Sequence, residues 1–376
     1  MKKCVVVSDS FKGTLSSLEI CNIARQSVPR FFPSCQVVTV PVADGGEGTV
    51  ECFIQVGGYA PEELTVSGPW GEPVRALWAR REGRAVIEMA CAAGLPMVGE
   101  RKNPELTTTY GVGQVIRHAV ELGCTEILLG LGGSCTNDGG CGCAAALGVK
   151  FFNRDGAEFV PVGGTLDQIA RIDPSGAKEL LQGVTVTAMC DVDNPLFGPL
   201  GAAHIFGPQK GAGQEMVARL DGQLRCLDAA LRRELSLSLA GLPGAGAAGG
   251  MGAGCVAFLW AELRPGIEAV LDMVDFDGCL EGADLVITGE GRIDAQSVRG
   301  KVISGVARRT APRNIPLVAI VGGIGEDAEE AYALGVTAMF GIDRPAHDFA
   351  RYAHRSADYY RRTLEDVLRL IRAVTE

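Results

Sequence analysis

The sequence predicts an α/β fold with a largely parallel sheet, arranged in two domains. Short apolar segments rich in β-branched residues alternate with amphipathic stretches of helical period, which is the pattern of strands joined by crossover helices. The chain has 376 residues, and chains of this length normally build more than one hydrophobic core. Hydrophobic residues make up 47% of the chain and charged residues 21%, which indicates a folded rather than a disordered protein.

The first fifty residues predict a strand, a helix and a second strand. The apolar residues 4–7 are expected to form a buried strand. Ser16, followed three residues later by Glu19, forms a capping-box pattern, so a helix is expected to run from there to about Val28. Residues 36–40 predict the next strand, which a proline ends.

From about residue 57 to residue 89 the pattern changes to short strands separated by turns. Turns that contain glycine separate the expected strands 74–79 and 84–89, which is typical of hairpins and marks the start of a second domain. The helices expected after this region are 110–122, 138–147, 214–235 and one from about His354, and the strands are 126–129, 184–189, 285–287, 317–321 and 338–340.

Charge and hydropathy argue against two kinds of partner. The formal net charge is −10, and no long basic run is present to bind nucleic acid or an anionic membrane. Residues 235–261 carry no charge but contain Pro243 and seven glycines, so they predict a loop and a short buried helix rather than a membrane span. The 13 cysteines and the lack of a secretory pattern indicate reduced thiols and a cytoplasmic protein.

Glycine is the compositional outlier, with 51 residues, about twice its usual share. Its clustering suggests loops that approach a ligand closely.

The first cluster, residues 8–13, places Asp9 and Lys12 at a strand end, where open α/β sheets bind ligands; the alternative is that Asp9 satisfies backbone amides. Residues 42–48 place Asp44 beside three glycines, to hold a metal or accept a proton; the alternative is a tight turn before a helix.

A third cluster, residues 129–140, combines a strand end, a glycine-rich loop and the start of a helix. In this order, unpaired amides and the helix dipole can receive a phosphate group. The candidate phosphate-binding residues are Gly132, Gly133, Ser134, Asn137 and Asp138. The loop matches neither G-x-G-x-x-G nor the P-loop. The alternative is that Asn137 or Asp138 only caps the helix.

A fourth cluster, residues 190–195, places Asp191 and Asp193 on one face of an extended segment. Two adjacent carboxylates repel each other unless a cation joins them, and Mg²⁺ favours such ligands beside substrate phosphates. The alternative is a solvated turn. The loop that follows offers Lys210 as a point charge for phosphate.

A fifth cluster follows the expected strand 285–287. It brings Glu290, Arg292, Asp294 and Lys301 together within a dozen residues. This density of charge among glycines favours a binding site over an ordinary solvated loop.

Cysteine and histidine give weaker signals. Cys141 and Cys143 lie two apart on an expected helix, where their side chains diverge by about 200°, so they are interpreted as small core residues and not as metal ligands. Cys135 is read in the same way, and the four histidines match no metalloprotease or triad spacing.

Seven segments rich in glycine or in charged residues follow one another along the chain. They are residues 8–13, 42–48, 132–140, 190–195, 206–211, 243–250 and 287–294. Together they resemble the signature segments of bacterial type I glycerate kinases, from residue 4 to about residue 325. The chain departs from that pattern at Cys135, where alanine is common, and at Val112, where threonine is usual; the helix from His354 matches weakly.

The resemblance implies a flavodoxin-like, Rossmann-type domain formed by both chain ends, residues 1–56 and 280–376. A second α/β domain, residues 57–279, is inserted between them. The implied activity is ATP-dependent phosphorylation of D-glycerate with Mg²⁺ and release of ADP. The expected product is 2-phosphoglycerate, and the alternative acceptor is the 3-hydroxyl group.

The resemblance and the residues together assign roles to the candidates. Asp191 and Asp193 are expected to hold Mg²⁺. The amides of Gly132 and Gly133, with Ser134, Asn137 and Asp138, are expected to bind the nucleotide phosphates. The substrate-binding group is Lys210, Glu290, Arg292, Asp294 and Lys301, whose three cations would hold the carboxylate and the developing charge. The catalytic group is Asp9, Lys12, Asp44 and Asp191, with Asp44 the expected base and Asp9 the second choice.

Two rival functions fit the sequence less well. A dinucleotide-dependent oxidoreductase requires a G-x-G-x-x-G fingerprint with an acidic residue about 20 positions later, and the sequence lacks it. A non-catalytic sensor of a small sugar acid gains nothing from paired carboxylates that suit a metal.

Overall fold

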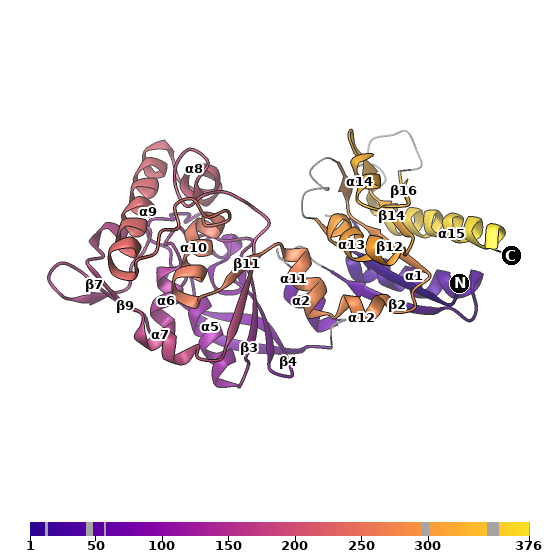
Figure 1. Cartoon of the computed structure of the whole chain (residues 1–376). Helices are drawn as coiled ribbons and strands as arrows, with labels where there is room; N and C mark the ends of the chain where they lie inside the picture. The colour runs from indigo at the N-terminus through magenta and orange to yellow at the C-terminus, as the bar shows by residue number, and fades with distance from the viewer. Residues whose placement is uncertain (12–13, 43–47, 56–57, 295–300, 344–352, 376) are drawn as a thin grey trace. The chain divides into compact units, whose positions relative to one another are not determined.

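The computed structural model describes residues 1–11, 14–42, 48–55, 58–294, 301–343 and 353–375. Lys12 and Asp44, two of the predicted catalytic residues, lie outside this described part of the chain. The chain divides into two compact units (Figure 1). Unit 1 comprises Met1–Asp44, Gln55–Gly57 and Pro265–Glu376, and unit 2 comprises Gly45–Ile54 and Gly58–Arg264.

Unit 1 is built on a five-stranded parallel sheet to which both ends of the chain contribute, the indigo and the orange-to-yellow segments of Figure 1. Its strands are β1 (Lys3–Ser8), β2 (Gln36–Pro41), β12 (Leu285–Gly289), β14 (Leu317–Val321) and β16 (Ala338–Gly341). Their order in the sheet is β16-β14-β12-β1-β2. Numbered within the unit this is the flavodoxin-like order 2-1-3-4-5, so the winding direction reverses between β1 and β12.

Unit 1 also contains helices, and the central strands β12 and β14 of its sheet are buried along their length. These helices are α1 (Ser17–Phe31), α11 (Gly266–Met273), α12 (Phe276–Leu280), α13 (Val302–Thr310), α14 (Glu330–Ala333) and α15 (Ser356–Thr375). The predicted capping box of α1 is confirmed, because Ser16 Oγ accepts from the Glu19 amide at 3.2 Å and the Glu19 carboxylate accepts from the Ser16 amide at 2.9 Å. Helices α1 and α15 form one core with β1, β12 and β14, and α13 lies against β12.

Unit 2 is built on a six-stranded mixed sheet in the order β11-β10-β6-β5-β4-β3. Its strands are β3 (Ala60–Ser67), β4 (Pro73–Arg81), β5 (Arg84–Glu88), β6 (Glu126–Gly130), β10 (Thr185–Met189) and β11 (Glu262–Arg264). The predicted hairpins are confirmed, because β4 pairs antiparallel with both β3 and β5. Strands β5, β6, β10 and β11 are parallel. Their order follows the chain without a reversal.

The helices of unit 2 bury small residues in some places and larger aliphatic residues in others. They include α3 (Ala90–Ala93), α4 (Leu95–Val98), α5 (Tyr110–Glu121), α6 (Cys141–Leu147), α7 (Ser175–Leu180), α8 (Ala202–Phe206), α9 (Gln214–Leu235) and α10 (Ala247–Leu259). A small antiparallel sheet of β7 (Lys150–Phe152), β8 (Glu158–Phe159) and β9 (Arg171–Asp173) was not anticipated by the sequence pattern. Residues 235–261 form a loop and a buried helix, and no helix among the described residues is long and apolar enough to cross a membrane.

Residues 265–279 group with unit 1, although the sequence analysis placed them in the inserted domain. An ion-pair network joins these residues to the rest of unit 1. The guanidinium of Arg309 on α13 contacts Glu268 at 2.9 Å and Asp272 at 2.6 Å on α11, and it also pairs with Asp277 on α12. The predicted α/β class with parallel sheets is confirmed, whereas the division into domains of residues 1–56 plus 280–376 and 57–279 stays a prediction.

Many glycines of unit 2 serve close packing of backbone on backbone. A Cβ on Gly113 of α5 would lie 2.3 Å from the carbonyl oxygen of Cys143 on α6. A Cβ on Gly249 of α10 would lie 2.0 Å from the carbonyl oxygen of Thr136, and Gly249 also has φ +70°. At these positions glycine lets segments of the protein approach one another, whereas the clustering of glycine in the sequence predicts close approach to a ligand.

Candidate active site

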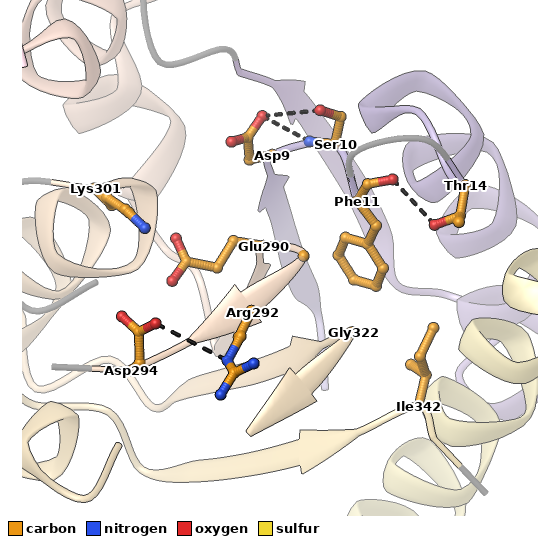
Figure 2. Close-up of a pocket in the computed structure, with 11 residues that line it drawn as sticks. Asp9, Ser10, Phe11, Thr14, Glu290, Arg292, Asp294, Lys301, Gly322 and Ile342 are labelled. Atoms are coloured by element: carbon orange, nitrogen blue, oxygen red, sulfur yellow. Dashed lines mark hydrogen bonds and ion pairs between the residues drawn. The ribbon is translucent and has the colours of Figure 1, made fainter. Parts of the chain in front are cut away.

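The reversal of strand order in unit 1 places the ends of β1 and β12 side by side. In open α/β sheets, ligands bind beyond the carboxyl ends of the strands at such a reversal. A cavity of about 430 Å³ lies here (Figure 2). Its lining residues are Asp9, Ser10, Phe11, Thr14, Glu290, Gly291, Arg292, Asp294, Lys301, Gly322 and Ile342. The first and fifth sequence clusters, far apart along the chain, therefore meet in one pocket.

Backbone pairing fixes the segment that carries most of the charged side chains. Beyond the main sheet, β13 (Arg292–Ile293) pairs in parallel with β15 (Gly323–Ile324). The Gly322 amide donates to the Glu290 carbonyl at 3.1 Å. A Cβ on Gly322 would lie 2.2 Å from the Gly291 carbonyl oxygen, so only glycine permits this approach. Glu290 and Arg292 therefore emerge from a paired backbone.

The end of β1 is tied to the end of β12 at the same place. The Asp9 amide donates to the Gly289 carbonyl at 2.9 Å, and Ser8 Oγ donates to the same oxygen at 3.0 Å. The carboxylate of Asp9 accepts from the Ser10 amide at 2.6 Å. This bond orients the side chain of Asp9, which lines the pocket.

The pocket holds three carboxylates and two cations at different depths. Glu290 is 5% exposed, whereas the side chain of Arg292 is 71% exposed. Arg292 Nε lies 4.0 Å from Asp294 Oδ2. Figure 2 shows Lys301 on the same side of the pocket as Glu290 and Asp294. Because its side chain is exposed, the Arg292 guanidinium can contact an anion in the pocket, and the carboxylates can accept hydrogen bonds from hydroxyl groups.

The glycine-rich loop of unit 2 follows β6 and differs sharply in exposure along its length. Gly132 and Gly133 reach the surface, Ser134 is 7% exposed, and Asn137 and Asp138 are fully buried. The loop backbone is bonded to the end of α3 and the start of α4, since the Cys135 amide donates to the Ala93 carbonyl at 2.9 Å and the Leu95 amide to the Gly133 carbonyl at 2.8 Å. Only the glycine tip of the predicted phosphate site is open to a ligand.

Lys210 lies beneath this loop and not on its surface. Its side chain is 2% exposed, and its ammonium donates to Ser134 Oγ and to the Thr136 carbonyl oxygen, both at 2.7 Å. Burial disfavours the charged form and lowers the pKa of Lys210 to about 8, while Cys135 and Asp138 act in the opposite direction. Lys210, which the sequence predicts to bind phosphate, is therefore already hydrogen-bonded to protein oxygens.

Asp138 joins the starts of two helices, which the sequence pattern alone did not indicate. Its carboxylate accepts from the Thr109 amide and hydroxyl, both at 2.8 Å, and from the amides of Gly140 at 3.1 Å and Gly142 at 3.3 Å. Thr109 is the N-cap residue of α5, and its hydroxyl accepts from the Cys143 amide at 2.8 Å. Burial raises the pKa of Asp138, and these four bonds oppose that rise. Thr109 was missed because its partner lies far along the chain.

Asp191 and Asp193 are both exposed in the segment that follows β10. Mg²⁺ usually keeps several waters and takes one or two protein carboxylates beside substrate phosphates, and an exposed pair fits that requirement. Among the described residues, no group of three or more histidine, cysteine, aspartate or glutamate side chains is arranged to hold a metal ion.

The two departures from the family pattern are buried. Val112 is fully buried in the apolar core of unit 2, and Cys135 is 1% exposed. Burial raises the pKa of the Cys135 thiol to about 12, which leaves it unreactive. Cys141 and Cys143 are fully buried core residues, as predicted.

Comparison with known proteins gives one consistent result. A family model described as the glycerate kinase family matches residues 4–372. The chain is 42% identical over 368 residues to a glycerate kinase of Bacillus subtilis (97% of this chain, 96% of that protein) and 43% identical over 343 residues to a glycerate 2-kinase of Escherichia coli (90% of each). A solved structure described as "putative glycerate kinase 2" from Salmonella typhimurium LT2 covers 100% of this chain and 99% of its own, with a TM-score of 0.89 at 38% identity.

Proposed function

The chain belongs to the glycerate kinase family and is a phosphotransferase, and from that membership we propose that it transfers the terminal phosphoryl group of ATP to D-glycerate and releases ADP. The proposed acceptor is the 2-hydroxyl group, giving 2-phosphoglycerate. The likeness to a relative named glycerate 2-kinase supports this choice. We also propose a cytoplasmic protein that acts on this small acid and on no nucleic acid or membrane, in line with its net charge of −10.

The pocket of unit 1 carries the proposal for glycerate. A three-carbon hydroxy acid needs cations for its carboxylate and acceptors for its hydroxyl groups. Arg292 and Lys301 supply the cations, and Glu290 and Asp294 supply the acceptors, around a cavity of about 430 Å³. In the proposed reaction Asp44 is the first choice for the proton acceptor, and Asp9, which lines the pocket, is the second. Lys12 adds positive charge. Lys12 and Asp44 lie outside the described residues.

The glycine-rich loop of unit 2 is the proposed site for the nucleotide phosphates. The surface position of Gly132 and Gly133, at the end of a parallel strand and before α6, suits contact between backbone amides and phosphate oxygens. Ser134 adjoins this tip, while Asn137 and Asp138 support it from inside. Asp191 and Asp193 are the proposed ligands of Mg²⁺, which when bound neutralises charge on the phosphates.

Positioning and charge stabilisation supply most of the catalysis in phosphoryl transfer. Accordingly, the groups assigned here bind and orient, and one carboxylate accepts the proton of the attacking hydroxyl group. The balanced step forms a bond from the glycerate oxygen to the terminal phosphorus, breaks the bond to ADP, and moves one proton to the carboxylate.

The deciding experiment is ³¹P NMR of the product formed from D-glycerate and ATP with Mg²⁺. The proposal predicts a phosphomonoester on the 2-position together with ADP. A 3-phosphate product would overturn the acceptor assignment. Binding of D-glycerate by calorimetry without any ATP turnover would overturn the kinase proposal in favour of a sensor.

A further inference from the structure

The glycine-rich loop has an exposed tip and a buried stem. Gly132 and Gly133 form the tip, with Ser134 at 7% exposure beside them, whereas residues 135–138 are at most 1% exposed. A ligand at this loop can touch the tip but not the stem. The side chains that hold the stem therefore act on the ligand only through the position they give to the tip.

Lys210 holds one side of the loop. Its ammonium binds Ser134 Oγ and the Thr136 carbonyl oxygen, each at 2.7 Å, so it joins the tip to the stem. The turn that carries it, the 3-10 helix Pro208–Lys210, ends at Gly211 with φ +94°. A Cβ on Gly211 would lie 2.5 Å from the Cβ of Lys102, so the turn is packed tightly against its neighbour. The ammonium is thus placed by a rigid support.

Asp138 holds the other side of the loop. It accepts four hydrogen bonds, two from Thr109 and one each from the amides of Gly140 and Gly142. A carboxylate has about four lone-pair positions, and these bonds satisfy it without a ligand. They attach the stem to the first turns of α5 and α6.

The two charges offset one another without direct contact. Lys210 is surrounded by neutral acceptors, and the carboxylate of Asp138 raises the pKa of Lys210 against the effect of burial. A buried charge is costly unless it is hydrogen-bonded and compensated. Removal of either side chain would leave the charge of the other buried without a nearby opposite charge. The loop arrangement in which both side chains are bound is therefore favoured over others.

We propose that Lys210 and Asp138 are positioning residues, which lock the tip Gly132-Gly133-Ser134 in the form that receives the nucleotide phosphates and do not themselves touch substrate. This inference rests on the proposed function for the role of the tip. The sequence predicts that Lys210 binds substrate, whereas this inference gives it the role of supporting the nucleotide site.

The test compares Lys210→Met with Lys102→Met. Lys102 is exposed and donates to the Gln209 carbonyl at 3.2 Å, so it touches the same turn without reaching the loop. For Lys210→Met we expect KM for ATP to rise about 10-fold while KM for D-glycerate stays within about twofold. Lys102→Met is expected to change neither. A rise confined to KM for D-glycerate would overturn the proposal, because it would make Lys210 a direct contact of the substrate.

A second pair of variants covers the case in which Lys210→Met does not fold. Thr109 is fully buried, and Thr109→Val removes the hydroxyl group that donates to Asp138 and accepts from the Cys143 amide, while it keeps the shape of the side chain. We expect a rise of about threefold in KM for ATP, which Thr109→Ser restores. A folded Thr109→Val enzyme with unchanged KM for ATP would contradict the proposal.

Hydrogen exchange of residues 131–138 in the ligand-free protein tests the locked loop separately from the proposed ATP-dependent activity. Lys210→Met and Thr109→Val are expected to speed exchange there, and Lys102→Met is not. Unchanged exchange in both folded variants would refute the lock, whether or not the enzyme uses ATP. Absence of turnover in the unaltered chain would instead refute the proposed function and leave this result valid.

Discussion

The pocket of unit 1 and the glycine-rich loop of unit 2 look alike in the sequence but differ in the structure. Both follow a buried parallel strand, and both combine glycine with charged residues. In unit 1 the strand order reverses, and the charged side chains line a cavity. In unit 2 the order does not reverse, and Lys210 and Asp138 are buried against protein groups. Charge at a strand end indicates a ligand contact where the topology opens a crevice, and a structural role where it does not.

The largest effect should come from the exposed cation of unit 1. We expect Arg292→Met to lower kcat/KM for D-glycerate about 100-fold, or ~2.7 kcal/mol. The melting temperature should change little, because the side chain of Arg292 is 71% exposed and substitutions at exposed positions usually cost little stability. Arg308→Met is the matched control and should keep full activity, because it removes a different surface arginine of unit 1, one that pairs with Glu268. Comparable activities of the two variants would break the contrast between the regions.

The lowered pKa of buried Lys210 should make the free energy of unfolding depend on pH. Its pKa is lowered from 10.5 to about 8 in the folded protein, so the unfolded chain binds this proton more tightly. The contribution of Lys210 to the free energy of unfolding should therefore increase by about 2–3 kcal/mol as the pH rises from 8 to 10.5. Urea unfolding of the unaltered protein and of Lys210→Met at pH 8 and pH 10 measures the difference. Parallel pH profiles of the two proteins would show that the buried lysine has an ordinary pKa.

Close packing of glycine in unit 2 predicts a large cost for one added methyl group. Gly113→Ala would place a Cβ 2.3 Å from the Cys143 carbonyl oxygen, and we expect the free energy of unfolding to fall by about 1–3 kcal/mol. Gly222 of α9 has no atom within 4 Å of such a Cβ, so Gly222→Ala should leave stability unchanged or raise it by about 0.5–1 kcal/mol. Equal effects of the two substitutions would remove close packing as the reason for the glycine.

The smallest expected effect concerns the departure from the family pattern at position 112. Val112→Thr restores the usual hydroxyl group at a fully buried site of the apolar core. We expect a loss of about 1 kcal/mol in stability, with KM for D-glycerate unchanged. Thermal unfolding and steady-state kinetics measure both, and a lowered KM would place this residue in contact with substrate.

Local patterns in the sequence predicted most of the elements. The capping box located the start of α1, and the periodicity of residues 214–235 gave the bounds of α9. The strand 317–321 was likewise predicted at both ends. The small sheet of β7, β8 and β9 was missed because two- and three-residue strands carry too little pattern to be recognised.

The site was predictable in composition but not in assignment. Asp9 and Glu290 lie 281 positions apart in numbering, and only the pairing of β1 with β12 brings them together. The sequence identified Lys210 and Asp138 as charged residues near glycine but could not show that protein oxygens and amides already engage them. Burial depends on long-range packing, which a pattern of neighbours along the chain does not contain.

Steady-state kinetics of Arg292→Met and Lys210→Met, measured side by side with both substrates varied, test the contrast between the two regions most directly. We predict that each variant affects a different Michaelis constant. KM for D-glycerate rises in Arg292→Met alone, and KM for ATP rises in Lys210→Met alone. A rise in the same Michaelis constant for both variants would contradict it.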